Sequence, residues 1–485
     1  MKLNQNLYRD KLHAAWIGKN IGGTMGTPYE GGREYLDIKG FVTDASVVLP
    51  NDDLDLQLVW LAALEARGPY RLTAADLGEF WLSYIVPYWN EYGIGKTNMR
   101  LGMFPPLSGD YRNTWRHSNG AWIRTEIWAS LAPGAPDIAA KYAIEDATVD
   151  HGAGEGTIAA AFVAAMQSSA YIVKTAREAI DIALTKIPEE SRVAKSVRFV
   201  IECYEGKKTP RETRDLILKL NADIGDGWFE APSNVAYTVL GLLFGEGDFK
   251  KSMITAINCG DDTDCTGATV GATLGILGGM AGIPDDWKAH IGESIVTISI
   301  NRGLLYGVPA TCAQLTDRVA HQTPLLLAAN HEDIWLTDGE SEIPADAPAK
   351  LSKSTETKER LRHLLPFSFT VDFAYASATL IYETTPDITP GGEVKVKVIV
   401  RNNWRDYGNA PYNLNLRWFL PDGFTVSGGS RTLRLPHFNA HDPAVAETEF
   451  TLHAGETVAA VNRAVLEITA DGRFTAGYVP VVMLG

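Results

Sequence analysis

The chain has 485 residues, of which 45% are hydrophobic and 21% charged, a composition typical of a soluble globular protein with two or three domains. Its formal net charge of -15 argues against nucleic acid and an anionic membrane surface as partners, because both attract basic surfaces. Four cysteines without a CxxC pair argue against a disulfide framework and a structural zinc site. The N-terminal stretch lacks the uninterrupted apolar run of a signal peptide, so we expect a cytoplasmic protein with reduced thiols.

Residues 8 to about 315 have the pattern of a helical protein. Alanine-rich segments with apolar residues three and four positions apart recur at 56–66, 157–184, 233–244 and 266–280. Gly- and Pro-rich stretches separate them, and strand patterns are scarce. An all-α domain over residues 1–320 is therefore expected.

The first helical segment, AAWIGKNIGGTMGTPYEGG (14–32), is rich in glycine. Gly18, Gly22 and Gly26 recur every four residues, a spacing that places them on one face of a helix and suits close packing against another helix. The segment matches neither a Walker A pattern nor a dinucleotide-binding GxGxxG. Glu30 follows the turn at Pro28 and is either a solvated turn carboxylate or part of a site.

Two acidic clusters stand at the starts of apolar helical segments, PNDDLDLQLVW (50–60) and CGDDTDCTGATV (259–270). Helix capping and the helix dipole account for one or two polar residues in each cluster, but not for three aspartates. Apolar helices belong in the core, so the two helix starts can meet in one cleft, where so many carboxylates require cations. Ligand sets dominated by carboxylate oxygens select Mg²⁺, Mn²⁺ or Ca²⁺ over zinc.

A third segment, DATVDHGAGEGTIAAAFVAAM (146–166), places Asp150, His151 and Glu155 before another alanine-rich helix. His151 lies next to glycines, where the backbone can approach a ligand closely. A single loop histidine is more often structural than functional, so both interpretations stay open.

The stretch from Thr266 to Ile283 is the one candidate for a membrane span, at about the minimum length of 18 residues. Its six glycines and the adjacent acidic cluster favour a buried helix instead.

The pattern changes near residue 320. Residues 321–364 are expected to form a linker, because 338–360 are polar, charged and poor in large apolar side chains. Residues 365–485 then alternate between apolar and polar positions in short runs separated by turn residues, which predicts an antiparallel β-sandwich of immunoglobulin-like type. No catalytic constellation is visible there, so an accessory domain is expected.

Taken together and in this order, these segments resemble the ADP-ribosylglycohydrolase family over about residues 8 to 315. Gly260-Asp261-Asp262-Thr263-Asp264-Cys265 looks like the family's Gly-Gly-Asp-Thr-Asp-Thr, and Asn51-Asp52-Asp53-Leu54 looks like its Thr-Asp-Asp-Thr. The segment from Gly22 to Glu30 is similar to the family's Gly-Asp-Ala-Leu-Gly-x-x-x-Glu, with Gly23 in place of the aspartate. Cys265 stands where the family has a ligating threonine, and sulfur is a poor partner for Mg²⁺.

The resemblance implies an all-α fold with a binuclear magnesium centre and cleavage of an N- or O-glycosidic bond to ADP-ribose or a related ribosyl or furanosyl group. The substrate would be a small-molecule glycoside or an ADP-ribosyl compound. The alternative is a non-catalytic, metal-stabilised ligand-binding protein on the same fold.

The implied site residues fall into three groups. The metal ligands would be Asn51, Asp52, Asp53, Asp262 and Asp264. The catalytic residues would be Glu30, Asp52 and Asp261. The substrate-binding residues would be Asn119, Gly120, His151 and Glu155.

Overall fold

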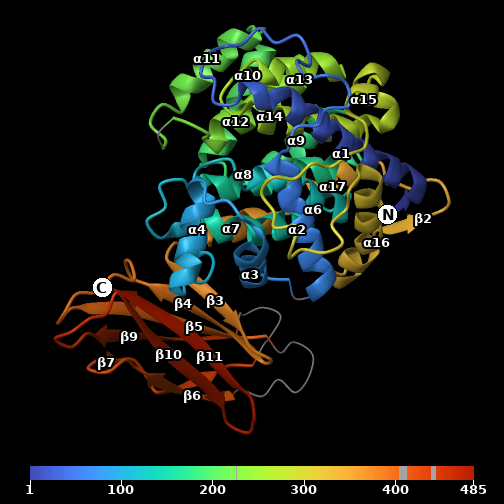
Figure 1. The fold of residues 1–485 in the computed structure, drawn as a ribbon. Helices are drawn as coiled ribbons and strands as arrows, with labels where there is room; N and C mark the ends of the chain where they lie inside the picture. Colours follow the sequence, from blue (N-terminus) through green and yellow to red (C-terminus); the bar gives the residue numbers. More distant parts are fainter. Residues whose placement is uncertain (71, 226, 404–411, 438–443) are drawn as a thin grey trace. The chain divides into compact units, whose positions relative to one another are not determined.

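The computed structural model describes residues 1–485 except 71, 226, 404–411 and 438–443. The described residues form two compact units (Figure 1). The first contains Met1–Gly93 and Asn113–Leu364 and is mainly helical; the second contains Ile94–Arg112 and Leu365–Gly485 and is built mainly from strands. The expected fold class, a helical part followed by antiparallel sheets, is confirmed.

The helical unit begins with β1 (Lys2–Asn4), which pairs in parallel with β2 (Trp335–Thr337). Between residues 5 and 170, the helices that belong wholly to this unit are α1 (Gln5–Gly26), η1 (Thr27–Tyr29), α2 (Asp52–Arg67), α3 (Ala74–Tyr84), η2 (Trp122–Arg124), α6 (Glu126–Leu131), α7 (Pro136–His151) and α8 (Glu155–Ala170). The later ones are α9 (Ala176–Leu184), α10 (Arg192–Glu205), α11 (Pro210–Leu220), α12 (Ala231–Phe244), α13 (Phe249–Ile257), α14 (Thr263–Gly278), η3 (Met280–Gly282), α15 (Asp285–Ile291), α16 (Cys312–Ala329), α17 (Ala347–Leu351) and α18 (Glu356–Arg362). Helix α4 (Asn90–Leu101) contributes residues to both units, and α5 (Leu107–Asp110) belongs to the second.

Helices α1 and α14 lie in backbone contact because glycines face each other along them. A Cβ atom built on Gly22 would lie 2.1 Å from the carbonyl carbon of Gly267, and one built on Gly26 would lie 2.4 Å from the backbone nitrogen of Asp264. The glycines spaced four residues apart therefore allow α1 to pack closely against α14, as their spacing predicts. The contact also brings the end of α1, which precedes Glu30, against the start of α14.

Helix α14 is buried along most of its length, as expected for a core helix. Among the described residues, we find no helix whose length and apolar character would suffice to cross a membrane.

The polar stretch after α16 packs on the helical unit. Lys186 Nζ donates to the carbonyl oxygen of Leu351 at 2.6 Å, and Thr357 Oγ1 donates to Asp137 Oδ1 at 2.6 Å. The helical unit thus extends to Leu364. The predicted boundary at residue 320, between a helical domain that folds on its own and a linker, stays a prediction.

The second unit contains two antiparallel sheets that share one apolar core (Figure 1). One sheet has the order β3 (Ser368–Asp372), β4 (Ala376–Tyr382), β5 (Glu393–Asn402), β9 (Val445–His453) and β7 (Thr425–Gly428). The other has the order β11 (Ala476–Leu484), β10 (Val461–Ala470), β6 (Tyr412–Phe419) and β8 (Thr432–Leu435). Buried and exposed positions alternate along β5 and β10, as the period of two in the sequence predicts.

Residues 94–112 belong to this second unit although they precede it by more than 250 positions in the chain. Met103, Leu107 and Tyr111 are buried in the same apolar core as the strands. Tyr111 also donates its hydroxyl hydrogen to Asp387 Oδ1 at 2.6 Å.

We expect Gly22→Ala to lower the melting temperature of the helical unit markedly. The added methyl group meets backbone atoms of Gly267, which cannot rotate away, so the cost should reach the upper end of the range for overpacking, about 3 kcal/mol. Thermal melts followed by circular dichroism measure it. Gly278→Ala, at the end of α14, is the control, because its Cβ would meet nothing within 4 Å. Equal melting temperatures for the two variants would contradict the backbone contact.

A fragment of residues 1–364 should self-associate, because the residues that bury Met103 and Leu107 are missing from it. Met103→Ser with Leu107→Ser should restore a monomeric fragment, whereas the same pair should destabilise the full chain by opening a cavity. Light scattering measures the association state of the fragment, and thermal melts measure the stability of the full chain. A monomeric unmodified fragment would show that residues 94–112 do not need the sheets.

Candidate active site

A cavity of about 470 Å³ lies in the helical unit where the end of α1 and the starts of α2 and α14 meet. Five acidic side chains line it: Glu30, Asp52, Glu91, Asp262 and Asp264. Such a concentration of carboxylates in one concave site is the chemical feature that marks it as the candidate site.

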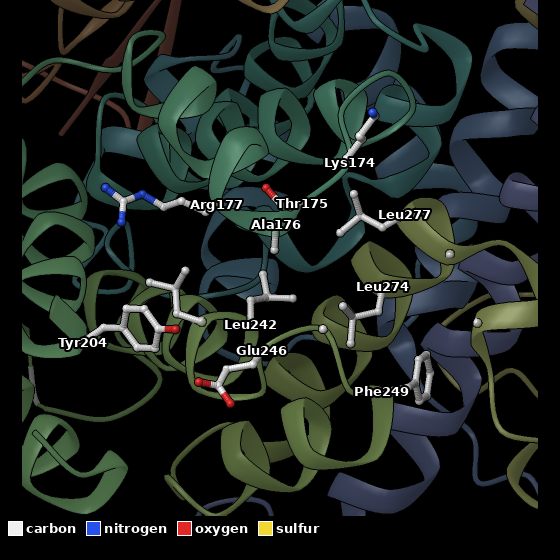
Figure 2. Close-up of a pocket in the computed structure, with 14 residues that line it drawn as sticks. Lys174, Thr175, Ala176, Arg177, Tyr204, Leu242, Glu246, Phe249, Leu274 and Leu277 are labelled. Carbon is white, nitrogen blue, oxygen red and sulfur yellow. The ribbon is translucent and has the colours of Figure 1, made fainter. Parts of the chain in front are cut away.

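A second cavity, of about 390 Å³, has a different character (Figure 2). Its apolar lining includes Leu242, Leu274 and Phe249. Three charged residues line it, Lys174, Arg177 and Glu246, and the last two already form ion pairs with neighbouring side chains. Its described lining contains a single carboxylate, Glu246, so we assign no chemistry to it.

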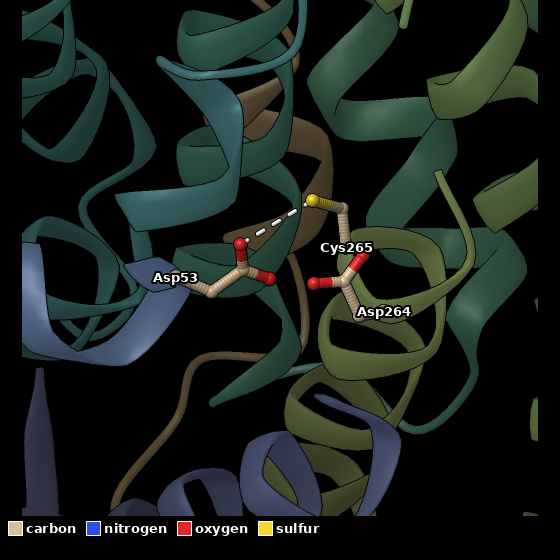
Figure 3. Close-up of side chains that lie close together, drawn as sticks. All are labelled: Asp53, Asp264 and Cys265. Carbon is tan, nitrogen blue, oxygen red and sulfur yellow. Dashed lines mark hydrogen bonds between the residues drawn. The ribbon is translucent and has the colours of Figure 1, made fainter. Parts of the chain in front are cut away.

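The two acidic clusters, some 200 residues apart in the sequence, meet at the first cavity. One oxygen from each of Glu30, Asp262 and Asp264 lies within 4.8 Å of the others. The same limit holds for one ligand atom from each of Asp53, Asp264 and Cys265 (Figure 3). Asp264 is common to both groups, so the groups are adjacent.

Burial makes these carboxylates costly in the absence of a cation. Asp53, Asp262 and Asp264 are 0%, 4% and 5% exposed, and each has one buried oxygen without a hydrogen-bond partner among the described residues. Burial, followed by the charge of Asp264, raises the pKa of Asp262 well above its usual range. Burial also raises the pKa of Asp53 well above that range, although Lys19 opposes the shift. Unpartnered buried carboxylate oxygens fit a hard divalent cation.

Glu30 is exposed at the edge of this group. The nearby charge of Asp264, then burial and the charge of Asp52, raises the pKa of Glu30 to about 8. Such a value is near the operating pH of most enzymes and suits a group that exchanges protons.

Helix α2 presents its aspartates through its N-terminal turn. Asn51 is the N-cap, and its Oδ1 accepts the backbone N–H of Asp53 at 2.7 Å. The phenol of Tyr92 donates to Asp52 Oδ2 at 2.8 Å. Asn51 thus caps the helix that carries these aspartates, and its role as a metal ligand stays a prediction.

Asp55, the third acidic residue of this turn, organises the cavity wall. Its Oδ2 accepts the backbone N–H groups of Ile298 and Ser299 at 2.6 and 2.7 Å. Ile298 lines the cavity. Burial, with a contribution from Asp52, raises the pKa of Asp55 to about 7.

Lys19 is a buried cation beside the carboxylates. It is 1% exposed, and its Nζ lies 3.1 Å from Glu126 Oε2 and 3.8 Å from Asp53 Oδ2. Burial lowers its pKa, but the charges of Glu126 and Asp53 outweigh this and raise it overall, so Lys19 is an ammonium. Gln57, on α2, donates to Glu126 Oε2 at 2.9 Å and so links the ion pair of Lys19 and Glu126 to that helix.

Asn119 and Gly120 line the cavity, and the substrate-binding role that the resemblance implies for them stays a prediction. Asn119 Nδ2 donates to Asp262 Oδ2 at 2.6 Å. A Cβ on Gly120 would lie 2.1 Å from Glu91 Oε1, so only glycine allows Glu91 to take its place.

The structure does not bring Asp261 into the cavity lining. Its backbone has φ 64°, and its Oδ1 and Oδ2 accept hydrogen bonds from the Phe229 backbone N–H at 3.2 Å and from Asn234 Nδ2 at 2.9 Å. Its backbone also exchanges hydrogen bonds with Gly31 and Gly32. Asp261 therefore holds the loop of Phe229, which does line the cavity, against the segment after Glu30.

His151 and Glu155 also lie outside the lining. The two carboxylate oxygens of Glu155 accept the backbone N–H groups of Arg192 and Val193, at the start of α10. His151 is fully buried, with Nδ1 2.9 Å from Asp150 Oδ1 and Nε2 3.2 Å from Ser118 Oγ.

Glu91 is the main residue that the sequence patterns missed. It is 6% exposed, and its Oε2 is buried without a hydrogen-bond partner among the described residues. Burial raises the pKa of Glu91, and His151 opposes the rise. Trp89 and Tyr92 line the cavity from the same stretch, VPYWNEYG. A single acid among aromatic residues follows no motif, so only the aromatic cluster itself was available as a signal.

Comparison with known proteins identifies the family to which the chain belongs. The sequence profile described as ADP-ribosylglycohydrolase matches residues 4–324. The chain belongs to the ADP-ribosylglycohydrolase family. The matched range contains both acidic clusters and every residue of the cavity lining. The family is hydrolytic, and the acidic groups described above can bind a metal.

Three solved structures that match the chain differ in how much of it they cover. One described as an ADP-ribosylglycohydrolase-related protein complex is 20% identical and covers 67% of this chain and 99% of its own, with a TM-score of 0.43. A FixG-related protein from Vibrio parahaemolyticus is 14% identical over 24% of this chain and 97% of its own, with a TM-score of 0.19. The GAE domain of GGA2p from Saccharomyces cerevisiae is 10% identical over 24% and 96%, with a TM-score of 0.16. No curated protein matches the sequence.

The pH dependence of stability should differ with and without Mg²⁺. Glu30 ionises near its ordinary pKa of 4.5 in the unfolded chain but near 8 in the folded protein. A carboxyl group whose pKa is raised on folding costs stability as the pH rises from the unfolded to the folded value, so the metal-free protein should lose stability between about pH 4.5 and 8. The raised pKa values of Asp53 and Asp262 act in the same direction.

Saturating Mg²⁺ should remove most of this decline, because metal binding favours the ionised carboxylates. Thermal melts at stepped pH, in EDTA or in Mg²⁺, measure both profiles. Glu30→Gln should flatten part of the decline in EDTA. Parallel profiles in EDTA and Mg²⁺ would contradict a cation site at these carboxylates.

Proposed function

We propose that this member of the ADP-ribosylglycohydrolase family is a metal-dependent glycosidase. It hydrolyses an N- or O-glycosidic bond to ADP-ribose or to a related ribosyl or furanosyl group. The observation that carries the proposal is the convergence of five acidic side chains on one cavity, several with buried oxygens that have no protein partner among the described residues.

Glu30, Asp262 and Asp264 are the residues that would hold a divalent cation from the cavity side, with Asp52 beside them in the lining. Mg²⁺ is the ion that carboxylate donors favour, with Mn²⁺ and Ca²⁺ as alternatives. Such a cation, when bound, orients vicinal sugar hydroxyls and lowers the pKa of a water molecule. Asn119 and Tyr92 fix the orientations of Asp262 and Asp52 through their hydrogen bonds, so the donors are preorganised.

Glu30 and Glu91 divide the proton transfers between them in this proposal. Hydrolysis at an anomeric carbon passes through an oxocarbenium-like transition state, in which a base activates water and an acid protonates the leaving group. Glu30 is the base, because it lies within the closely spaced donor group at the exposed edge of the site. Glu91 is the acid, because it lines the cavity outside the closely spaced donor group and burial raises its pKa.

Aromatic side chains provide the walls for an apolar sugar face or leaving group. Trp89, Tyr92 and Phe229 line the cavity alongside the carboxylates. A combination of apolar walls and a few convergent polar groups is usual for small-molecule sites.

A substrate panel tests the proposal. ADP-ribosyl, nucleoside and aryl-furanoside compounds are incubated with Mg²⁺, Mn²⁺ or Ca²⁺, and released reducing sugar is measured. We expect release of sugar that EDTA abolishes. Specific ligand binding without turnover would favour the alternative, a metal-stabilised binding protein.

Asp262→Asn with Asp264→Asn should abolish hydrolysis while the protein stays folded, because amides bind the cation too weakly. Glu91→Gln should lower kcat by about 10²–10⁴-fold without loss of metal binding, because the leaving group loses its proton donor. Asp285→Asn, at a side chain that is 98% exposed, is the control. Full activity in the double variant would show that these aspartates do not serve the reaction.

A further inference from the structure

The surroundings of Asp53 differ from those of the other carboxylates. Asp264 belongs both to a group with Glu30 and Asp262 and to a group with Asp53 and Cys265 (Figure 3). The first group offers only oxygen atoms. The second offers a thiol and a carboxylate that lies near a buried ammonium.

The ammonium of Lys19 is fixed in place. Its Nζ donates to the carbonyl oxygen of Ile123 at 2.7 Å and pairs with Glu126 at 3.1 Å, and the side chain is 1% exposed. It lies 3.8 Å from Asp53 Oδ2. Like charges repel strongly where water is excluded, so Lys19 opposes a further cation beside Asp53.

Cys265 faces the other oxygen of Asp53. Its Sγ donates to Asp53 Oδ1 at 3.3 Å (Figure 3). A thiol is a soft and poor ligand for hard cations such as Mg²⁺. Asp53 therefore meets a positive charge on one side and a sulfur donor on the other.

We propose that the protein holds one divalent cation, at Glu30, Asp262 and Asp264, and that the Lys19 ammonium and the Cys265 thiol take the place of a second cation beside Asp53. This inference rests on the proposed function and specifies its metal site. The family resemblance alone implies two ions.

Mn²⁺ binding to the full chain tests the inference without reference to activity. Equilibrium dialysis should give one tightly bound Mn²⁺ per wild-type chain, with the electron paramagnetic resonance spectrum of an isolated ion. The triple variant Lys19→Met, Glu126→Gln, Cys265→Thr should bind a second Mn²⁺. Ions about 3.5–4 Å apart should then give an exchange-coupled spectrum.

The substitution of Glu126 is included because removal of Lys19 alone would leave a buried charge unpaired and endanger folding. Glu126→Gln alone and Cys265→Thr alone are the controls, and both should keep one ion because Lys19 remains. Circular dichroism confirms folding, and Lys19→Met with Glu126→Gln is the fallback if the triple variant unfolds; it should bind a second Mn²⁺ at least ten-fold more tightly than wild type.

Two equally tight Mn²⁺ ions in the wild type would overturn the inference and leave the proposed function intact. A folded triple variant that still binds one ion, with no gain in the fallback variant, would also overturn it. One bound Mn²⁺ without hydrolysis of any panel substrate would support the inference and count against the proposed glycosidase activity. No bound Mn²⁺ would overturn both.

Discussion

The backbone contact between α1 and α14 is the constraint on which the candidate site depends. Gly22 and Gly26 allow the two helices to touch, and the contact at Gly26 reaches the backbone of Asp264 itself. Glu30 follows within one short helical turn, η1. A side chain at either glycine would separate the helices and therefore move Glu30 away from the aspartates. The glycine stripe thus determines the spacing of the carboxylates, although no glycine in it carries chemistry.

Once the carboxylates are gathered, their mutual repulsion has to be offset. The protein provides a partner for three of them: Tyr92 for Asp52, Asn119 for Asp262 and Lys19 for Asp53. Each of these partners satisfies one side of its carboxylate. The buried oxygens of Asp262 and Asp264 that remain unpartnered among the described residues are consistent with a cation site, and binding there would contribute to folding as well as to chemistry.

Features that arise from local periodicity can be predicted from the sequence, whereas features that depend on distant partners cannot. Helical and alternating patterns report the burial of nearby residues, so the fold class and the convergence of the acidic helix starts could be predicted. Residues 94–112 join the second unit through apolar side chains in a Gly- and Pro-rich stretch without periodicity, so no local pattern indicates their partner. Lys19 resembles a surface lysine until Glu126, more than 100 residues away, is placed beside it. Conversely, Asp261 and Glu155 have the right chemistry, but their oxygens already accept hydrogen bonds from backbone N–H groups and, for Asp261, from a side-chain amide.

Three of the positions at which the chain departs from the family motifs, Gly23, Asn51 and Cys265, gather on one side of the site. Asn51 replaces a hydroxyl residue and accepts a hydrogen bond from the backbone N–H of Asp53. A Cβ atom built on Gly23 would lie 2.3 Å from the amide nitrogen of Asn51. An aspartate at position 23 would therefore collide with the Asn51 amide, which couples these two departures. Cys265 contacts the same aspartate through its sulfur. The side formed by Glu30, Asp262 and Asp264 retains the motif residues. At these three positions the surroundings of Asp53 differ from the motifs, whereas Glu30, Asp262 and Asp264 match them. These departures point to the same asymmetry that the Lys19 ammonium indicates independently.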